Sequence, residues 1–426
     1  MVEVSFLTDE PYILGALGAK ISQSPLSKSI DELYRECKDD EKASKKLVQD
    51  IIKKYNHMIL ADFSSQAIVI DGLTRFAALY LWRNVNVENQ VYAAGIETSL
   101  RVVKIDKNTR HHPIANCLWD KSIDIYREAI EQNIPQQDAR YVLPEAIYTR
   151  IILSSPPRYL FKIGNSLEEA PLQELQTIGR KINEIIEKET GMISEEKVLS
   201  RWDFFGGSGE DIKEKVDIHV SKYSSEKVDP YSISMIMYLK GSLALFAQLV
   251  RQRLNLCVIE PLENIAYKGK FVVPPSFGDE IMKKYREFAK EANELQMRMI
   301  ENSHVKDPSF VYLLLLGQQA DARLYGSGYG LIDLSKERSE GVAQWEIRSK
   351  VGIPVTKELA KFQEIRNKIG PRCYREGRCI EPLTFKTKMA ICPSFKVAGG
   401  KWDRSLEELL DLLDESSKFS VFTVRS

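Results

Sequence analysis

The chain has 426 residues, enough for two domains of ordinary size, and its 60 basic residues (Lys and Arg) balance its 60 acidic ones. A formal net charge of zero gives no support to bulk binding of nucleic acid or membrane, so an anion site must be a local cluster of cations. Six cysteines do not make a disulfide framework in a chain this long, and no stretch approaches the roughly 18 continuous apolar residues of a membrane span. Because the first residues also lack a basic leader, we expect a soluble cytoplasmic protein.

Amphipathic helices dominate the predicted secondary structure, because apolar residues recur at helical intervals with charged residues between them. In chain order, the predicted helices are 27–37, 41–55, 172–189, 278–303 and 404–417. Short apolar runs predict strands at 66–72, 99–106 and 231–239. Strands and helices do not alternate regularly, which favours an α+β fold over a doubly wound one.

Two parts of the chain follow the same order of elements, which indicates a tandem duplication. The segments 72–83 and 241–253 are both Gly-led apolar helices with arginine near their ends, and each is followed by a glutamate-bearing loop. Gly and Ser at 201–211 predict a linker between the copies. We therefore predict a first domain at 1–200 and a second, divergent one at 201–426.

The stretch GIETSLRVV (95–103) places a carboxylate, a hydroxyl and a guanidinium at alternate positions, at Glu97, Ser99 and Arg101. In an extended chain these three side chains share one face. Taken alone, this pattern also describes a solvated strand face.

Motifs in both halves resemble those of the flavin-dependent thymidylate synthases. The first half carries His57, Asp62 (where the family has Glu) and the segments ETSLR (97–101), RYVLP (140–144) and YTRIILSSPPR (148–158). The second half carries FAQLVRQR (246–253), FVVPP (271–275), KERSEGVAQWEIR (336–348) and GPRCYREGRC (370–379). The resemblance implies that each copy is an antiparallel sheet flanked by long helices.

Each half departs from the family where the other keeps the motif. The family's Arg-His-Arg triplet reads Arg83-Asn-Val in the first half and Arg-Gln-Arg in the second. The second half's loop, EPLEN (260–264), lacks the Ser and Arg, and Tyr329 replaces the helix arginine. Since family sites form between subunits of a homotetramer, the two halves would form a pseudo-dimer with a shared site. Two chains would then form a homodimer that mimics the tetramer.

The resemblance also implies roles for individual residues. Arginines converging on a phosphate satisfy its oxygens, which suits Arg101, Arg140 and Arg338. Arg251 is the predicted catalytic residue, because in the family it favours negative charge on the pyrimidine. The predicted substrate-binding residues are Glu97, Ser99, Arg101, Arg140, Gln248, Arg251 and Arg338. The predicted FAD-binding residues are His57, Asp62, Arg83, Arg158, Gln252 and Arg253.

Structural alternatives stay open for some of these residues. Arg251 and Arg253 also suit the C-terminus of a helix, where cations interact with the helix dipole. His57 is equally compatible with a capping or core position. We predict no metal site, because the His111–His112 pair is isolated and the tail cysteines Cys373, Cys379 and Cys392 fit no usual zinc spacing.

The implied activity is reductive methylation of dUMP at C5, with FAD as cofactor and NADPH and methylenetetrahydrofolate as co-substrates. The chemistry needs no covalent protein nucleophile, which agrees with the absence of a persuasive Cys–His pair. Two alternatives stay open: modification of another pyrimidine nucleotide at C5, or a non-catalytic homologue that binds nucleotide or flavin.

Overall fold

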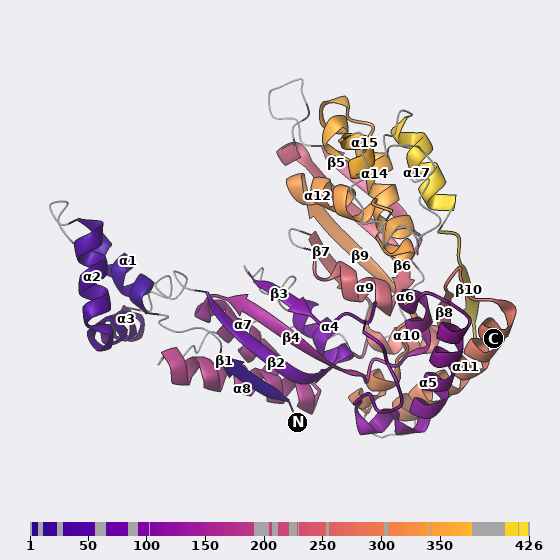
Figure 1. The fold of residues 1–426 in the computed structure, drawn as a ribbon, viewed down its shortest axis with the longest axis horizontal. Helices are drawn as coiled ribbons and strands as arrows, with labels where there is room; N and C mark the ends of the chain where they lie inside the picture. Colours follow the sequence, from indigo (N-terminus) through magenta and orange to yellow (C-terminus); the bar gives the residue numbers. More distant parts are fainter. Residues whose placement is uncertain are drawn as a thin grey trace. The chain divides into compact units, whose positions relative to one another are not determined.

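The computed structural model divides the chain into two compact units, which are described separately (Figure 1). Unit 1 comprises Met1–Ser99, Arg110–His112 and Ala146–Trp202, and unit 2 comprises Leu100–Thr109, Pro113–Glu145 and Asp203–Ser426. The structure describes residues 2–6, 12–23, 29–55, 65–83, 93–101, 103–190, 204–206, 212–220, 228, 230–252, 255–301, 306–341, 343–376, 405–415 and 417–424.

Unit 1 contains a four-stranded antiparallel sheet in the order β1-β2-β4-β3. The strands are β1 (Glu3–Phe6), β2 (Gln66–Thr74), β3 (Ala94–Glu97) and β4 (Tyr148–Ser155). The helices are α1 (Ile13–Gln23), α2 (Ile30–Asp39), α3 (Glu41–Tyr55), α4 (Arg75–Arg83), α7 (Pro157–Glu168) and α8 (Gln173–Thr190). Helix α4 packs on β2 and β4, whereas α8 packs on β1 and α7.

The sequence of β2 explains how the sheet faces its core. Alternate residues from Gln66 to Ile70 are buried and the others are half-buried, as expected for a strand with one covered face. The pairing with β4 shifts between Asp71 and Leu73, and Gly72 between them has a φ of 77°. Glycine adopts this left-handed conformation without a steric penalty, so it permits the bulge that leads into α4.

Unit 2 contains a second four-stranded antiparallel sheet, in the order β5-β6-β9-β7, and a two-stranded sheet of β8 and β10. The strands are β5 (Lys215–Val220), β6 (Ile233–Ser242), β7 (Asn255–Ile259), β8 (Lys270–Val273), β9 (Gln319–Ser327) and β10 (Ser420–Thr423). The α-helices are α5 (Asn116–Glu131), α6 (Gln136–Ala139), α9 (Leu243–Leu249), α10 (Leu262–Lys268), α11 (Asp279–Glu301), α12 (Gly328–Arg338), α13 (Trp345–Ile347), α14 (Ile353–Leu359), α15 (Arg372–Arg375) and α17 (Leu406–Glu415). The remaining turns of helix are η3 (Pro113–Ala115), η4 (Arg140–Val142), η5 (Pro230–Ser232), η6 (Pro308–Leu313), η7 (Arg348–Gly352) and η8 (Gln363–Lys368).

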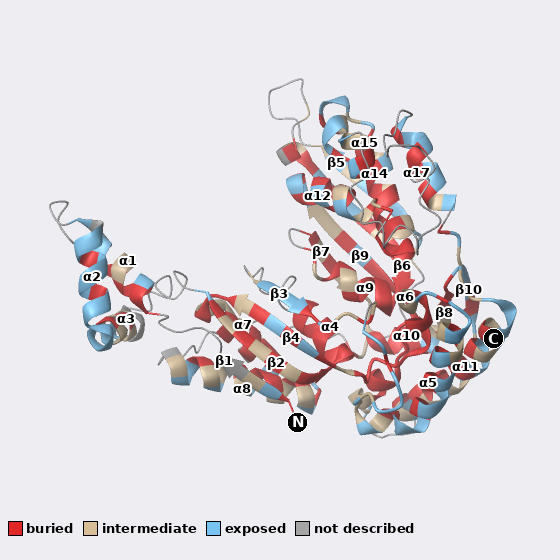
Figure 2. Cartoon of the chain, viewed as in Figure 1, coloured by how far each residue is buried: buried red, intermediate tan, exposed pale blue. Residues whose placement is uncertain are grey.

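The two four-stranded sheets have the same topology. In each, the first strand pairs with the second, the second with the last, and the last with the third along the chain. Helices α4 and α9 follow the second strands, and α7 and α12 follow the last ones. Figure 2 shows buried residues along β2, β4, β6 and β9 and along α4 and α9.

A buried polar network fixes the AQWEI segment in the core of unit 2. The Glu346 carboxylate accepts hydrogen bonds from Ser242 N (2.7 Å), Ser242 Oγ (2.5 Å) and Tyr141 Oη (2.5 Å). Burial raises the pKa of Glu346, although the hydrogen bonds from Ser242 and Tyr141 oppose the shift. Gln344 Nε2 donates to Tyr141 Oη at 2.7 Å, and Gln344 Oε1 caps α13 at Ile347 N. The segment is therefore held by partners from two distant parts of the sequence.

Most predicted elements are confirmed, including an α+β fold with antiparallel sheets. The five predicted helices correspond to α2, α3, α8, α11 and α17, and the strands at 66–72 and 231–239 to β2 and β6. The strand predicted at 99–106 is wrong, because β3 ends at Glu97 and none of the described residues from 99 to 106 lies in a strand. Asp106 explains part of this, since its carboxylate accepts from Asn108 N at 2.9 Å and Thr109 Oγ1 at 3.3 Å in a local turn.

The structure describes residues 204–206 of the linker predicted at 201–211, and the division between the two units, after Trp202, falls within that stretch. Phe204 is fully buried, and its carbonyl oxygen accepts from Glu263 N at 3.0 Å. The Phe205 ring lies 5.9 Å from that of Phe310. Phe204 therefore belongs to the core of unit 2, whereas Phe205 is half-buried.

Candidate functional site

Four of the predicted arginines lie in unit 2, and we call Arg101, Arg140, Arg251 and Arg338 the arginine cluster. Arg101 lies in the turn after β3, Arg140 begins η4, Arg251 follows α9, and Arg338 ends α12. Local hydrogen bonds orient two of the side chains: Arg140 Nε donates to Gln137 O at 3.1 Å and Arg251 Nε donates to Ala247 O at 2.7 Å.

The charge of Arg338 is repelled by those of two other members of the cluster. Burial lowers the pKa of Arg338; Glu337 opposes the shift, whereas Arg101 and Arg251 add to it. A guanidinium nevertheless stays protonated in proteins, so the folded chain bears the cost of holding these cations together. A bound anion would offset that repulsion.

Backbone packing brings Arg338 to this place. A Cβ on Gly352, in the π-helical turn η7, would collide with the carbonyl group of Arg338. Glycine is needed for this close approach of η7 to the end of α12. The AQWEIR segment begins a helix at Trp345, and the π-turn η7 continues it into α14 without a break.

The two predicted glutamines lie beside the cluster at α9. Gln248 is half-buried, and its Nε2 donates to Ala244 O at 3.2 Å. Gln252 is buried, and its amide oxygen, turned towards Arg338, accepts from Arg338 Nε at 2.6 Å. Gln252, predicted to bind FAD, therefore contacts an arginine predicted to bind substrate.

Asp138 is a buried carboxylate of this region that was not predicted from the sequence. It accepts hydrogen bonds from Ser276 Oγ and Trp345 Nε1, each at 2.7 Å. Burial raises the pKa of Asp138; these two hydrogen bonds oppose the shift, as do the charges of Arg140 and Arg101. The only sequence signal is its place two residues before Arg140, which does not distinguish it from exposed acids.

The other described site candidates belong to unit 1. Glu97 is buried and forms an ion pair with the buried Arg75, whose Nη1 also donates to Thr98 O at 2.7 Å. Ser99 is half-buried. Because β3 ends at Glu97, the prediction that Glu97, Ser99 and Arg101 share one face of a strand is wrong.

Two predicted FAD-binding arginines end or begin helices of unit 1. Arg83 ends α4, is buried, and places its guanidinium carbon 5.2 Å from the centre of the Tyr80 ring. Arg158, in the first turn of α7, lies 6.0 Å from the ring of Tyr159. Predicted site residues His57, Asp62 and Arg253 lie outside the described residues, as do Cys379 and Cys392.

The glutamate of the second loop is used structurally. Lys268 Nζ lies 2.8 Å from both Glu260 Oε2 and Asp321 Oδ2, and Asp321 N donates to Glu260 Oε1 at 2.7 Å. All three side chains are largely buried. Glu260 therefore has its ion-pair partner in its own unit, as Glu97 has in Arg75, although Lys268 is shared with Asp321.

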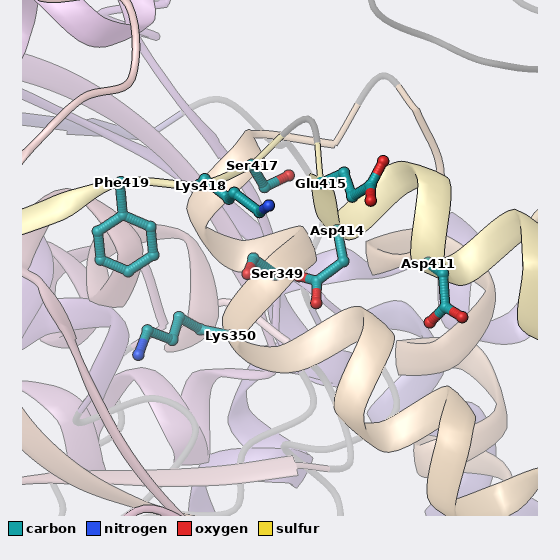
Figure 3. A pocket seen from close by; sticks show the side chains of 8 residues that line it. All are labelled: Ser349, Lys350, Asp411, Asp414, Glu415, Ser417, Lys418 and Phe419. Atoms are coloured by element: carbon teal, nitrogen blue, oxygen red, sulfur yellow. Dashed lines mark hydrogen bonds between the residues drawn. The ribbon is translucent and has the colours of Figure 1, made fainter.

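A cavity of about 650 Å³ lies elsewhere in unit 2, between α17 and η7. Figure 3 shows Phe419 and Lys350 at one end and Asp411 at the other. Its lining residues are Ser349, Lys350, Asp411, Asp414, Glu415, Ser417, Lys418 and Phe419, which include none of the predicted site residues.

Metal-binding clusters and membrane-spanning helices are both absent from the part of the chain that the structure describes. No group of three or more His, Cys, Asp or Glu side chains in that part of the chain is arranged to hold a metal ion. Among the described helices, none combines the length and apolar character required to cross a membrane.

Comparison with known proteins gives a family match for part of the chain. Residues 8–190 match the family described as thymidylate synthase complementing protein, which confirms the resemblance found in the sequence over that segment. The segment includes Arg101 and Arg140 but not Arg251 or Arg338. No curated protein matches the chain.

Two solved structures show weak similarity. A UMP/dUMP methylase, PolB from Streptomyces cacaoi with bound 5-Br dUMP, is 13% identical with a TM-score of 0.33, over 44% of this chain and 90% of the other. Thymidylate synthase X from Helicobacter pylori with FAD and dUMP is 16% identical with a TM-score of 0.33, over 44% of this chain and 95% of the other.

Proposed function

We propose that the chain is a flavin-dependent thymidylate synthase-like transferase, which reductively methylates dUMP at C5 with methylenetetrahydrofolate as carbon donor. The arginine cluster carries the proposal, because mutually repelling guanidiniums in one unit suit a phosphate dianion. The family match at 8–190 supports the same activity.

Each member of the site has a proposed task. Arg101, Arg140 and Arg338 bind the phosphate through charged hydrogen bonds, with Glu97 and Ser99 on the nucleotide loop. Gln248 faces a base edge, since its amide both donates and accepts. Arg251, the proposed catalytic residue, stabilises negative charge that develops on the pyrimidine ring.

We further propose that the chain is a tandem duplication, with copies at 1–200 and 201–426 that form a pseudo-dimer. The shared strand order of the two sheets supports it. So does a reciprocal pairing inside unit 2, where Glu145 N donates to Leu314 O (2.8 Å) and Leu316 N donates to Leu143 O (2.9 Å). Segments related by a two-fold axis contact each other in this reciprocal way. A homodimer would then contain four copies of the module, like the family's homotetramer.

FAD is the proposed cofactor, with NADPH as reductant. Arg83 and Arg158 are the proposed contacts to the phosphates of FAD, because the planar guanidinium fork binds phosphate oxygens in pairs. His57, Asp62, Gln252 and Arg253 are the other proposed contacts. When bound and reduced, FAD supplies the reducing equivalents of the reaction, while the protein contributes orientation and electrostatics.

The experiment that tests the activity is tritium release from [5-³H]dUMP, with and without methylenetetrahydrofolate. Folate-dependent release by FAD-loaded protein is the expected result, together with a flavin absorbance that dUMP perturbs. Release from another pyrimidine nucleotide alone would reassign the substrate. Protein that takes up no FAD and releases no tritium would contradict the proposal and favour a non-catalytic homologue.

Replacing Glu260 by alanine should leave dUMP affinity within about twofold of wild type, because its carboxylate is already engaged by Lys268 and by Asp321 N. Stability should fall by about 1–3 kcal/mol, the usual cost of an unsatisfied buried hydrogen-bonding group. Urea unfolding and calorimetric titration with dUMP check both values. A tenfold loss of affinity at unchanged stability would instead give the second loop a binding role.

A further inference from the structure

Asp138 lies in a short helix that contacts both first-half arginines of the cluster. Helix α6 carries Gln137 and Asp138 directly before Arg140. Arg101 Nη2 donates to the side-chain Oε1 of Gln137 at 3.3 Å, and Arg140 Nε donates to the backbone oxygen of Gln137 at 3.1 Å. The position of α6 therefore decides where both guanidiniums lie.

The Asp138 carboxylate anchors this helix through neutral donors. Its side chain is almost fully buried; Oδ2 accepts from Ser276 Oγ and Oδ1 accepts from Trp345 Nε1. Ser276 follows β8 and Trp345 begins α13, so two distant segments hold one carboxylate. The Trp345 ring is in turn stacked on Tyr141, with 5.8 Å between ring centres. Because neither donor is a cation, the carboxylate stays in place whether or not an anion occupies the arginine cluster.

The charge of Asp138 acts on the same two arginines. Attraction to the Asp138 carboxylate raises the pKa of Arg101, whereas burial lowers it. The charges of Arg140 and Arg101 in turn lower the pKa of Asp138. A fixed negative charge beside two guanidiniums restricts their orientations before a ligand arrives. Binding then costs less side-chain entropy.

We propose that Asp138 is a positioning residue of the anion site: held by Ser276 and Trp345, its carboxylate keeps Arg101 and Arg140 oriented to receive a phosphate. The nucleotide identity rests on the proposed function, whereas recognition of the phosphate group does not. A carboxylate near an anion also repels it, so the two effects have opposite signs and can be separated by experiment.

Asp138→Asn removes the charge and keeps the size of the side chain. We expect it to weaken binding of dUMP and of inorganic phosphate by about tenfold in calorimetric titrations of the full chain. Ser276→Ala, which removes one anchor but keeps the charge, should cause a smaller loss. If repulsion dominated, Asp138→Asn would instead tighten binding of both probes, and this would overturn the proposal.

A double-mutant cycle separates positioning from a general structural effect. In an Arg101→Ala/Arg140→Ala background, Asp138→Asn should cause no further loss of phosphate affinity, because the groups it orients are gone. A further tenfold loss there would show that Asp138 acts on the whole fold and would overturn the proposal. Wild-type protein that binds inorganic phosphate but not dUMP would contradict the proposed function alone. In that case, inorganic phosphate is the ligand with which the mutant cycle tests the role of Asp138.

Discussion

Arg338→Ala should weaken dUMP binding by about 1.5–3 kcal/mol, the usual contribution of a charged hydrogen bond, and Arg101→Ala should have a similar effect. Arg338 is the sharper test, since it lies in the second half of the chain and Arg101 in the first. Calorimetric titration with dUMP measures both. Arg127→Ala, at an exposed position on α5, is the matched control and should leave affinity unchanged.

The double variant Arg101→Ala/Arg338→Ala should lose less dUMP-binding free energy than the sum of the losses in the two single variants. Arg101 contributes to lowering the pKa of Arg338, so removing Arg101 reduces the cost of holding the Arg338 charge. Each single variant should lose less than about 1 kcal/mol of stability without ligand. Removing one arginine loses the packing of its side chain but also relieves the repulsion between Arg101 and Arg338. Unchanged dUMP affinity in both single variants would remove the shared site from the proposal.

The elements that could be predicted from the sequence are those with strong periodicity. In α3 and α11 the apolar residues recur every three or four positions, and both helices lie within a residue or two of their predicted bounds. The grouping of Arg101 with Arg251 and Arg338 could also be anticipated, because each half lacks motif residues that the other retains. The binding roles of these residues remain predictions.

The remaining features depend on tertiary contacts that no local pattern encodes. The run at 99–106 has the composition of a strand, yet β3 ends where Glu97 pairs with Arg75. Phe204 follows a charged helix and precedes glycines, as in a linker, but its burial is decided by distant residues of unit 2. Asp138 resembles many exposed acids in sequence, and only its contacts with Ser276 and Trp345 distinguish it.

Glu97→Ala should destabilise unit 1 by about 3–5 kcal/mol, the cost of leaving a buried charge without its partner. Both side chains of the Arg75–Glu97 pair are at most 3% exposed, and the carboxylate of Glu97 also accepts from Thr149 Oγ1 at 3.5 Å. Urea unfolding followed by circular dichroism measures the loss. Glu97→Gln should cost less, because the amide oxygen can still accept a hydrogen bond from Arg75.

The pair of Glu97 and Arg75 also permits a test of which function the carboxylate serves. Arg75→Met/Glu97→Met removes both charges, so it should be more stable than either single variant. If the folded double variant binds dUMP as wild type does, Glu97 serves the sheet and not the nucleotide. If stability recovers while dUMP affinity stays low, the carboxylate contributes to both, as the resemblance implies. A single variant as stable as wild type would contradict the buried ion pair, because an unpaired buried guanidinium cannot be accommodated without cost.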